Sequence, residues 1–141
     1  MAYWLFKSEP GTWSWEDQTK KGKEGEGWDG VRNYQANNNM KKMKIGDLGF
    51  FYYSVKEKQI VGIVRVIGEH RPDPTDKKGI FGMVVIEAVQ EVEKYVHLSE
   101  MKSNHKLANL ALIKQARLSV VPISKEHWKE ICIMAETKNK F

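Results

Sequence analysis

The sequence predicts an α+β fold, in which an antiparallel, partly closed β-barrel is surrounded by short helices. Residues 48–54, 60–69 and 81–92 are dense in Val, Ile and aromatic side chains, as β-strands are. The helix signals are short and lie between or after these stretches. Because most links between strands are hairpin-like, curling the sheet toward a barrel hides the largest share of strand edges.

The chain begins with a strand and a short helix. Residues 3–7 are rich in aromatic side chains and predict the first strand, which Pro10 stops. Ser14 and Asp17 have the spacing of a capping box, which predicts a helix over 15–20.

A second helix follows a solvated, glycine-rich loop at 20–27. Asp29 is a good N-cap for this helix, which we expect over roughly 31–43. Its core-facing side chains at helical spacing are Ala36, Met40 and Met43.

The rest of the chain alternates strands and helices. The turn at 72–76, rich in Pro and Asp, separates the strands 60–69 and 81–92. Short helices are expected within 98–110, and a last strand over 117–122. Ser124 caps a terminal helix with one apolar face, formed by Trp128, Ile131, Cys132 and Ala135. The tail at 138–141 is expected to fray.

The bulk properties fit one domain over residues 1–141. The net charge of +5 permits attraction to a phosphate backbone without requiring it. No apolar run approaches the ~20 residues that a membrane helix needs, and no signal peptide is visible. Cys132 is the single cysteine, so we expect a reducing, cytoplasmic compartment and no disulfide.

Aromatic residues are concentrated near the N-terminus. Eleven of the fifteen lie in the first 54 positions, within the stretches 3–10, 13–15, 28–35 and 50–54. A core alone does not need Arg, Asn, Gln, Lys and Glu between its rings, whereas a pocket for a flat polar ring does. Aromatic faces stack on such a ring, and amide or guanidinium groups bind its edge. The pattern therefore predicts a pocket near the amino end.

Each stretch also has a purely structural interpretation. Arg32 could pair with Asp29 or Glu9, and Asn33 could hold a loop. Ser8 and Glu9 could satisfy the backbone of a turn. The succession of polar residues after Trp28 favours a binding site over these alternatives.

The other two stretches leave the same choice open. Alternation along a strand places Phe51 and Tyr53 on one face, and Phe50, Tyr52 and Ser54 on the other. For any single ring, packing in the core is the more probable role. The last expected strand places Arg117 and Ser119 on one face, where Arg117 either meets the ligand or is solvated.

Signals for catalysis or metal binding are weak. The four His residues show no metal-ligand spacing, and a phosphate-cradling glycine motif and a nucleophile elbow are both missing. Asp73 and Asp76 are most simply turn formers. We therefore expect no metal, no cofactor and no catalytic residues.

Several segments together resemble the EVE-domain family of the PUA-like superfamily. They are YWLFKSEP at 3–10, WDGVRNYQANN at 28–38, KIGDLGFFYYS at 44–54 and RLSV at 117–120, with further likeness at 60–66 and 72–75 and in the C-terminal helix. The resemblance implies a partly closed barrel and a pocket that holds a modified nucleobase. The side chains that it implies for this pocket are Trp4, Lys7, Ser8, Glu9, Trp28, Arg32, Asn33, Tyr34, Tyr52, Tyr53, Ser54, Arg117 and Ser119.

Three positions depart from the family pattern. Tyr53 stands where the family commonly has His, which replaces an imidazole by a phenol. Asn37 stands where Arg is frequent, which removes a cation that could have met a phosphate. Ala116 stands where Ser is common.

The leading hypothesis is a binding module, not an enzyme, for DNA or RNA that carries a methylated or hydroxymethylated cytosine. Trp28 or Trp4 would stack on the base, and Asn33, Ser54 and Ser8 would bind its edge. Cations would meet phosphates: Arg32, Arg117, Lys41 and Lys42.

Two alternatives stay open. One is a small amidohydrolase for an acylated nucleoside, an activity found among ASCH relatives, acting through Lys7, Ser8 and Glu9. Neighbouring strand residues point to opposite faces, which argues against a direct pair of Lys7 and Ser8. The other alternative is a protein-interaction module.

Overall fold

The fold, seen in a computed structural model that describes residues 1–138, is built on one six-stranded sheet. Of the tail expected to fray, residues 139–141 lie outside the described part. The strands are β1 (Tyr3–Ser8), β2 (Glu26–Gly27), β3 (Leu48–Tyr53), β4 (Gln59–Pro72), β5 (Gly82–His97) and β6 (Val120–Ile123), in the spatial order β2-β5-β4-β3-β1-β6.

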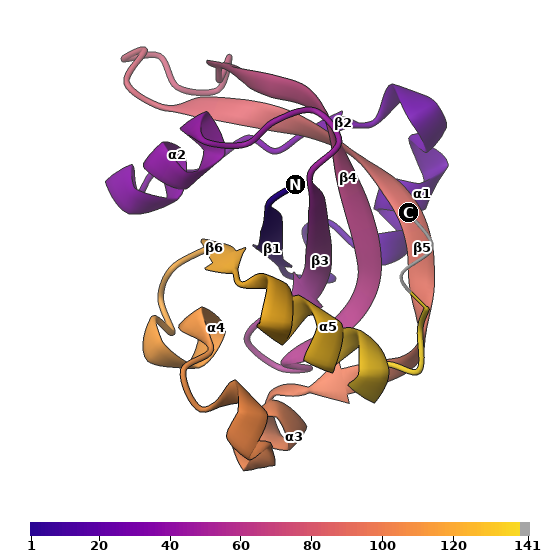
Figure 1. Ribbon diagram of the computed structural model, residues 1–141. Helices are drawn as coiled ribbons and strands as arrows, with labels where there is room; N and C mark the ends of the chain where they lie inside the picture. The colour runs from indigo at the N-terminus through magenta and orange to yellow at the C-terminus, as the bar shows by residue number, and fades with distance from the viewer. Residues whose placement is uncertain (139–141) are drawn as a thin grey trace.

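The sheet curls but does not close, as Figure 1 shows for the long strands β4 and β5. Their pairing register shifts at several points along the hairpin, and the β3–β4 register shifts between Phe51 and Tyr52. Such bulges bend strands and increase their twist. The predicted α+β class and partly open barrel are confirmed.

The sheet is mixed, whereas the sequence predicted antiparallel pairing throughout. β1 pairs in parallel with β3, from Tyr3 opposite Leu48 to Ser8 opposite Tyr53. The connection between these strands contains two helices and is long enough to return the chain to the same end of the sheet. The other edge of β1 pairs antiparallel with β6.

The helices are short and lie around the sheet. They are α1 (Trp15–Lys20), α2 (Tyr34–Lys41), α3 (Leu98–Ser103), α4 (Ala111–Lys114) and α5 (Lys125–Met134), with 3₁₀ turns η1 (Gly22–Glu24) and η2 (His105–Leu107). The capping box of Ser14 and Asp17 is confirmed at α1. The Ser124 cap of α5 is confirmed as well. The apolar faces predicted for α2 and α5 are buried.

The start of α2 differs from the prediction. Asn33 is the N-cap, since its side-chain oxygen accepts a hydrogen bond from the Ala36 N–H at 2.9 Å. The expected cap, Asp29, lies in an irregular loop before the helix. Gly30 in this loop has a φ of 79°, a left-handed conformation that interrupts any helix begun at Asp29.

Aromatic rings fill both faces of the strand β3. On one face Phe50 stacks on Trp128 of α5, with ring centroids 4.0 Å apart. On the other face Phe51 makes edge contacts with Trp15 and Trp28, at 5.3 Å and 5.8 Å. The predicted alternation along this strand is therefore confirmed, and the second face carries Trp28 toward the end of β1. Within residues 1–138, no helix is long and apolar enough to cross a membrane.

Candidate functional site

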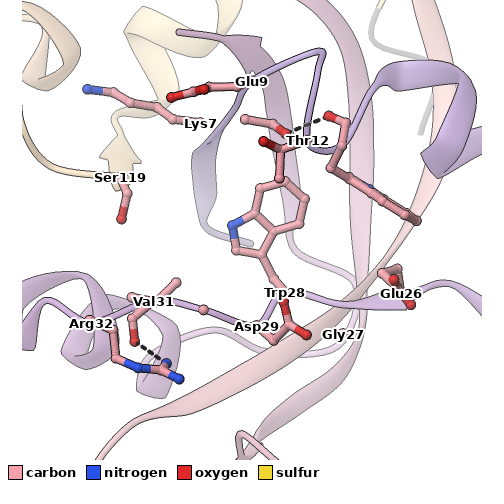
Figure 2. A pocket seen from close by; sticks show the side chains of 13 residues that line it. Lys7, Glu9, Thr12, Glu26, Gly27, Trp28, Asp29, Val31, Arg32 and Ser119 are labelled. Atoms are coloured by element: carbon pink, nitrogen blue, oxygen red, sulfur yellow. Dashed lines mark hydrogen bonds between the residues drawn. The ribbon is translucent and has the colours of Figure 1, made fainter. Parts of the chain in front are cut away.

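A pocket of about 470 Å³ opens where the end of β1 faces the loop after β2 (Figure 2). Its walls come from three separate parts of the chain: the end of β1 with the turn after it, the loop 26–32, and Ser119 before β6. The lining residues are Lys7, Ser8, Glu9, Thr12, Trp13, Glu26, Gly27, Trp28, Asp29, Gly30, Val31, Arg32 and Ser119.

Trp28 is one of the two aromatic residues that line the pocket, the other being Trp13. The inner edges of the Trp28 indole contact Phe6 and Phe51, with centroids 5.4 Å and 5.8 Å away, and only 9% of the residue is exposed. These contacts fix the ring. Figure 2 shows the indole nitrogen turned toward the side of the pocket where Lys7 and Ser119 lie. Among residues 1–138 this N–H has no hydrogen-bond partner, so it is free to donate to a ligand.

The loop that carries Trp28 is anchored at both ends. The Trp28 N–H donates to the Val84 carbonyl at 2.7 Å, beside the short β2–β5 pairing. Further along, the carboxylate of Asp73 accepts the Gly30 N–H at 2.8 Å and the Arg32 guanidinium at 3.1 Å. The Arg32 guanidinium also donates to the Thr75 hydroxyl at 3.0 Å. Arg32 is therefore paired with Asp73, and neither Asp29 nor Glu9 is its partner.

Asp73 is more than the turn former that the sequence indicated. It does form the turn, since Oδ1 accepts from the backbone and hydroxyl of Thr75 at 2.7 Å each. Its side chain is fully buried. Burial alone would raise its pKa, but the hydrogen bonds from Thr75, Gly30 and Arg32 outweigh burial and lower the pKa to about 2. The carboxylate thus stays charged and holds the pocket loop on the β4–β5 hairpin.

The opposite wall joins the first strand to the segment before the last strand. The Lys7 ammonium donates to the Ala116 carbonyl at 2.7 Å, and the Lys7 N–H donates to the Ser119 carbonyl at 3.0 Å. Burial lowers the pKa of the half-buried Lys7 amine. The Ser8 hydroxyl donates to the Trp13 carbonyl at 2.6 Å. The hydroxyl proton is hydrogen-bonded to a carbonyl, which is too weak a base to remove it. Ser8 is therefore not activated as a nucleophile by this partner.

The charges at the pocket have both signs. Lys7 and Arg32 are cationic, whereas Glu9, Glu26 and Asp29 are acidic. Arg32 is already neutralised by Asp73. A ligand group placed inside therefore meets acceptors as well as donors, which suits a neutral polar ring better than a phosphate. Among the residues described, no group of three His, Cys, Asp or Glu is placed to hold a metal ion.

The structure brings together six of the residues predicted for the site: Lys7, Ser8, Glu9, Trp28, Arg32 and Ser119. The sequence analysis did not assign seven others to the pocket: Thr12, Trp13, Glu26, Gly27, Asp29, Gly30 and Val31. Most of these are neighbours of a predicted residue in the chain, so extending each motif by a few residues would have found them.

Four predicted residues lie outside the pocket because they have structural partners. Trp4 is buried, and its indole N–H donates to Asp47 Oδ2 at 3.1 Å. Tyr52 is also buried, which raises its pKa to about 12. The Tyr53 hydroxyl accepts the Trp15 N–H at 2.7 Å, and the Ser54 hydroxyl donates to the Ser8 carbonyl at 3.4 Å. The expectation that these side chains line the pocket is wrong.

Three more predicted residues lie on the neighbouring surface. Asn33 caps α2 and, with Arg117, lines a separate shallow pocket of about 340 Å³ formed with Gln35, Gln115, Ala116 and Leu118. Arg117 precedes β6, so the strand predicted from residue 117 begins three residues later. Tyr34 is 65% exposed. The expected meeting of Trp28, Asn33 and Ser54 in one pocket therefore does not occur.

The departures from the family pattern have structural roles. Asn37 is buried, and its Oδ1 accepts the Gly82 N–H at 3.0 Å and lies 2.9 Å from His70 Nε2. It fastens α2 to the β4–β5 hairpin. Tyr53 holds the first residue of α1. Ala116 contributes its carbonyl to Lys7.

Comparison with known proteins gives concordant matches in sequence and structure. The sequence matches the EVE domain over residues 2–134. Thymocyte nuclear protein 1 of Gallus gallus is 33% identical, over 97% of this chain and 70% of its own length. A crystal structure of a protein from Agrobacterium tumefaciens superimposes with a TM-score of 0.94 at 48% identity, covering 99% of this chain and 96% of that one.

A further match carries a ligand. Human THYN1 protein, solved in complex with DNA containing 5-methylcytosine, superimposes with a TM-score of 0.89 at 32% identity, covering 98% of this chain and 99% of that one. Both the sequence match and the structural matches extend over nearly the whole chain. The chain therefore belongs to the EVE-domain family, with its PUA-like fold.

Proposed function

We propose that this protein binds nucleic acid and holds one modified nucleobase, a methylated or hydroxymethylated cytosine, in the pocket beside Trp28. The observation that carries the proposal is the fixed indole with a free N–H at the base of a cavity of about 470 Å³. Cavities of this size, within the range of about 300–1,000 Å³, are typical of small-ligand sites. The structural match to a human relative in complex with 5-methylcytosine DNA supports the same choice of ligand.

The lining groups suit an amino-bearing base. Trp28 offers a stacking face, and Ser119 and Thr12 offer hydroxyl groups. The carboxylates of Glu9 and Asp29 line the same pocket and accept from an exocyclic amine, as acidic side chains do from cytosine N4. Arg32 is paired with Asp73, which leaves Lys7 as the pocket cation that faces either the base carbonyl or the adjoining phosphate. These contacts replace the earlier assignment of Asn33 and Ser54 to the base edge.

Extracting a base from a stacked strand costs a few kcal/mol, and stacking on an aromatic side chain returns about 1–3 kcal/mol. Contacts with the backbone must supply the rest. The exposed lysines Lys41 and Lys42 at the end of α2, together with Arg117, are the proposed phosphate contacts. We take the cytosol as the working compartment, since Cys132 is a free, buried thiol.

We propose further that the protein binds its ligand without hydrolysing it. Ser8 donates to a carbonyl and Lys7 donates to another, so the two do not form a nucleophile and base. Hydrolysis of an N-acylated cytidine by the wild-type protein, lost in Lys7→Ala, would replace binding by catalysis as the assigned function.

The decisive experiment is a pair of fluorescence anisotropy titrations at fixed salt. Two single-stranded oligonucleotides of identical sequence carry either one 5-methylcytosine or one cytosine at the central position. We expect tighter binding of the methylated strand, and a parallel titration with 5-hydroxymethylcytosine ranks the modifications. Equal affinity for all three strands would exclude modified-base recognition. The same series made as RNA decides between the two nucleic acids.

A further inference from the structure

A pair of aromatic rings, one exposed and one partly buried, lies next to the pocket. Tyr34, the first residue of α2, is 65% exposed, and its ring centroid is 5.0 Å from that of Phe81 at the end of the hairpin turn. Across residues 1–138, Tyr34 is the one aromatic residue among the large apolar side chains that are well exposed. A ring this exposed contributes little to the core, and its packing against Phe81 makes it part of a two-ring aromatic surface rather than a single scattered side chain.

Arg32 connects this ring pair to the pocket. Its guanidinium carbon lies 5.9 Å from the centroid of the Phe81 ring, and the same residue lines the pocket. The guanidinium is held by Asp73 at 3.1 Å and by Thr75 at 3.0 Å. Arg32, whose guanidinium is held in place, therefore contacts both the pocket and the ring pair. Only one residue, Asn33, separates it from Tyr34 in the chain.

The turn that presents Phe81 is ordered and carries two exposed lysines. The Asp76 carboxylate accepts the N–H groups of Lys78, Ile80 and Phe81 at 3.0, 2.9 and 2.7 Å. Lys77 and Lys78 are exposed on this turn. Flanking ammonium groups match the phosphates of a nucleic-acid strand that continues beyond the pocket.

We infer that the exposed face of Tyr34, packed against Phe81 with 45° between the two ring planes, forms a stacking platform for the nucleobase next to the one held in the pocket. The inference rests on the proposed function. A base that leaves the stack unstacks its neighbours, and a sequence-tolerant aromatic surface at the pocket mouth restacks one of them. The platform therefore accepts any base, while the pocket selects the modified one.

Fastening the hairpin to α2 does not require the ring pair. Asn37 Oδ1 already joins these two elements, because it accepts the Gly82 N–H in a buried hydrogen bond and lies 2.9 Å from His70 Nε2. The exposed face of Tyr34 adds nothing to that join. Recognition of a neighbouring base accounts for the exposure of Tyr34, the two exposed lysines of the turn and the shared Arg32 together.

The test is a double-mutant cycle between protein and ligand. The ligands are a single strand with one 5-methylcytosine and two matched strands with an abasic site directly 5′ or directly 3′ of it. For the wild type we expect one abasic position, and not the other, to weaken binding about tenfold. Tyr34→Ala should weaken binding of the intact strand equally and lose sensitivity to that abasic site. Tyr34→Phe should behave as wild type, because the hydroxyl is not used.

Free 5-methylcytidine separates the two proposals. It occupies the pocket alone, so its binding, followed by NMR chemical-shift changes, should be the same in wild type and Tyr34→Ala. Two results would overturn the platform and leave the pocket proposal intact. One is an unchanged affinity of Tyr34→Ala for the methylated strand. The other is additivity, in which the abasic site weakens binding to Tyr34→Ala as much as binding to the wild type. If the wild type binds neither 5-methylcytidine nor the methylated strand, the proposed function fails, and the platform with it. A melting temperature for Tyr34→Ala close to wild type shows that the fold is retained.

Discussion

The carboxylate of Asp73 and the guanidinium of Arg32 lie 3.1 Å apart and join the pocket loop to the β4–β5 hairpin. The two residues are far apart in the chain, and each belongs to a segment with little regular structure. The position of Trp28 depends on this bond, because Gly30, held by the same carboxylate, lies between Trp28 and Arg32. The shape of the pocket is therefore set by a buried charge in a turn of the hairpin.

Asp73→Asn should lower the free energy of unfolding by about 1–3 kcal/mol, since it removes a charged acceptor of several buried hydrogen bonds. Urea unfolding followed by Trp fluorescence measures this change. Binding of the methylated strand should weaken as the loop relaxes. Glu69→Gln is the matched control, because Glu69 is an exposed carboxylate on the same hairpin. Equal stability losses in the two variants would contradict the anchoring role.

The same carboxylate gives a pH prediction. Its pKa in the folded protein is about 2, below the ordinary value of 3.8. Above that ordinary value the group is ionised in both states, and its stabilisation is fully present. As the pH falls toward 2, the unfolded chain binds the proton first and the stabilisation is lost. The stability difference between wild type and Asp73→Asn should thus shrink between pH 6 and pH 2, measured by denaturant titration at each pH.

Trp28→Phe should weaken binding of the methylated strand about tenfold, since the smaller ring stacks less and has no N–H. Phe fits beside Phe6 and Phe51 better than Ala, so the protein should stay folded. Trp128→Phe is the matched control: it removes an indole from the other face of the sheet, with an N–H that has no partner among residues 1–138. Anisotropy titrations of both variants decide the matter. A binding loss of the same size in the control would show a general effect of core packing.

Lys7 predicts how binding depends on alkaline pH. Burial lowers the pKa of this amine below its ordinary 10.5, so it loses its proton at a lower pH than a free lysine side chain does. Affinity should fall as the pH rises through this lowered pKa. Titrations between pH 7 and pH 10 with a strand of A and modified C, whose bases do not ionise there, measure the effect. Lys7→Arg stays charged and should bind with a flat profile, whereas a flat wild-type profile would remove Lys7 from the site.

Replacing Lys41 and Lys42 by Gln should reduce the salt dependence of binding and leave the preference for the modified base unchanged. Each lost phosphate contact on a single strand reduces the slope of log K against log salt by about 0.7. The control is a double Gln variant at Lys125 and Lys129 on α5, which covers the sheet face opposite Trp28. If the Lys41/Lys42 variant keeps the wild-type slope of log K against log salt, the nucleic-acid strand does not contact these two lysines.

Local chemistry predicted much of the fold. The Ser14 cap, the apolar stripe of α2 and the alternation along β3 depend on neighbouring residues, and all are confirmed. The cap of α2 was predicted at Asp29 and lies at Asn33, because the start of this helix is not set locally. The Gly30 N–H donates to the distant Asp73, which holds the chain out of a helix until Asn33.

The site was predicted in part for a related reason. An aromatic residue in a motif indicates either a pocket or a core, and only its packing partners distinguish them. Trp4 and Tyr52 belong to the core alone, whereas Trp28 packs on the core and also lines the pocket. The parallel pairing of β1 with β3 could not be predicted from the sequence pattern either, since hydrophobic alternation does not encode strand direction.

The place of β1 between β3 and β6 has a consequence for biosynthesis. Tyr3 pairs with Ile123, and Lys7 is bonded to residues 116 and 119. A nascent chain must therefore keep its aromatic first strand unpaired on one side until residues 116–123 have left the ribosome, a delay that favours slow folding and chaperone contact. Ligand recognition begins only after translation has passed Ser119, so a chain stalled at residue 114 should be captured by a holdase and should fail to retain the methylated strand.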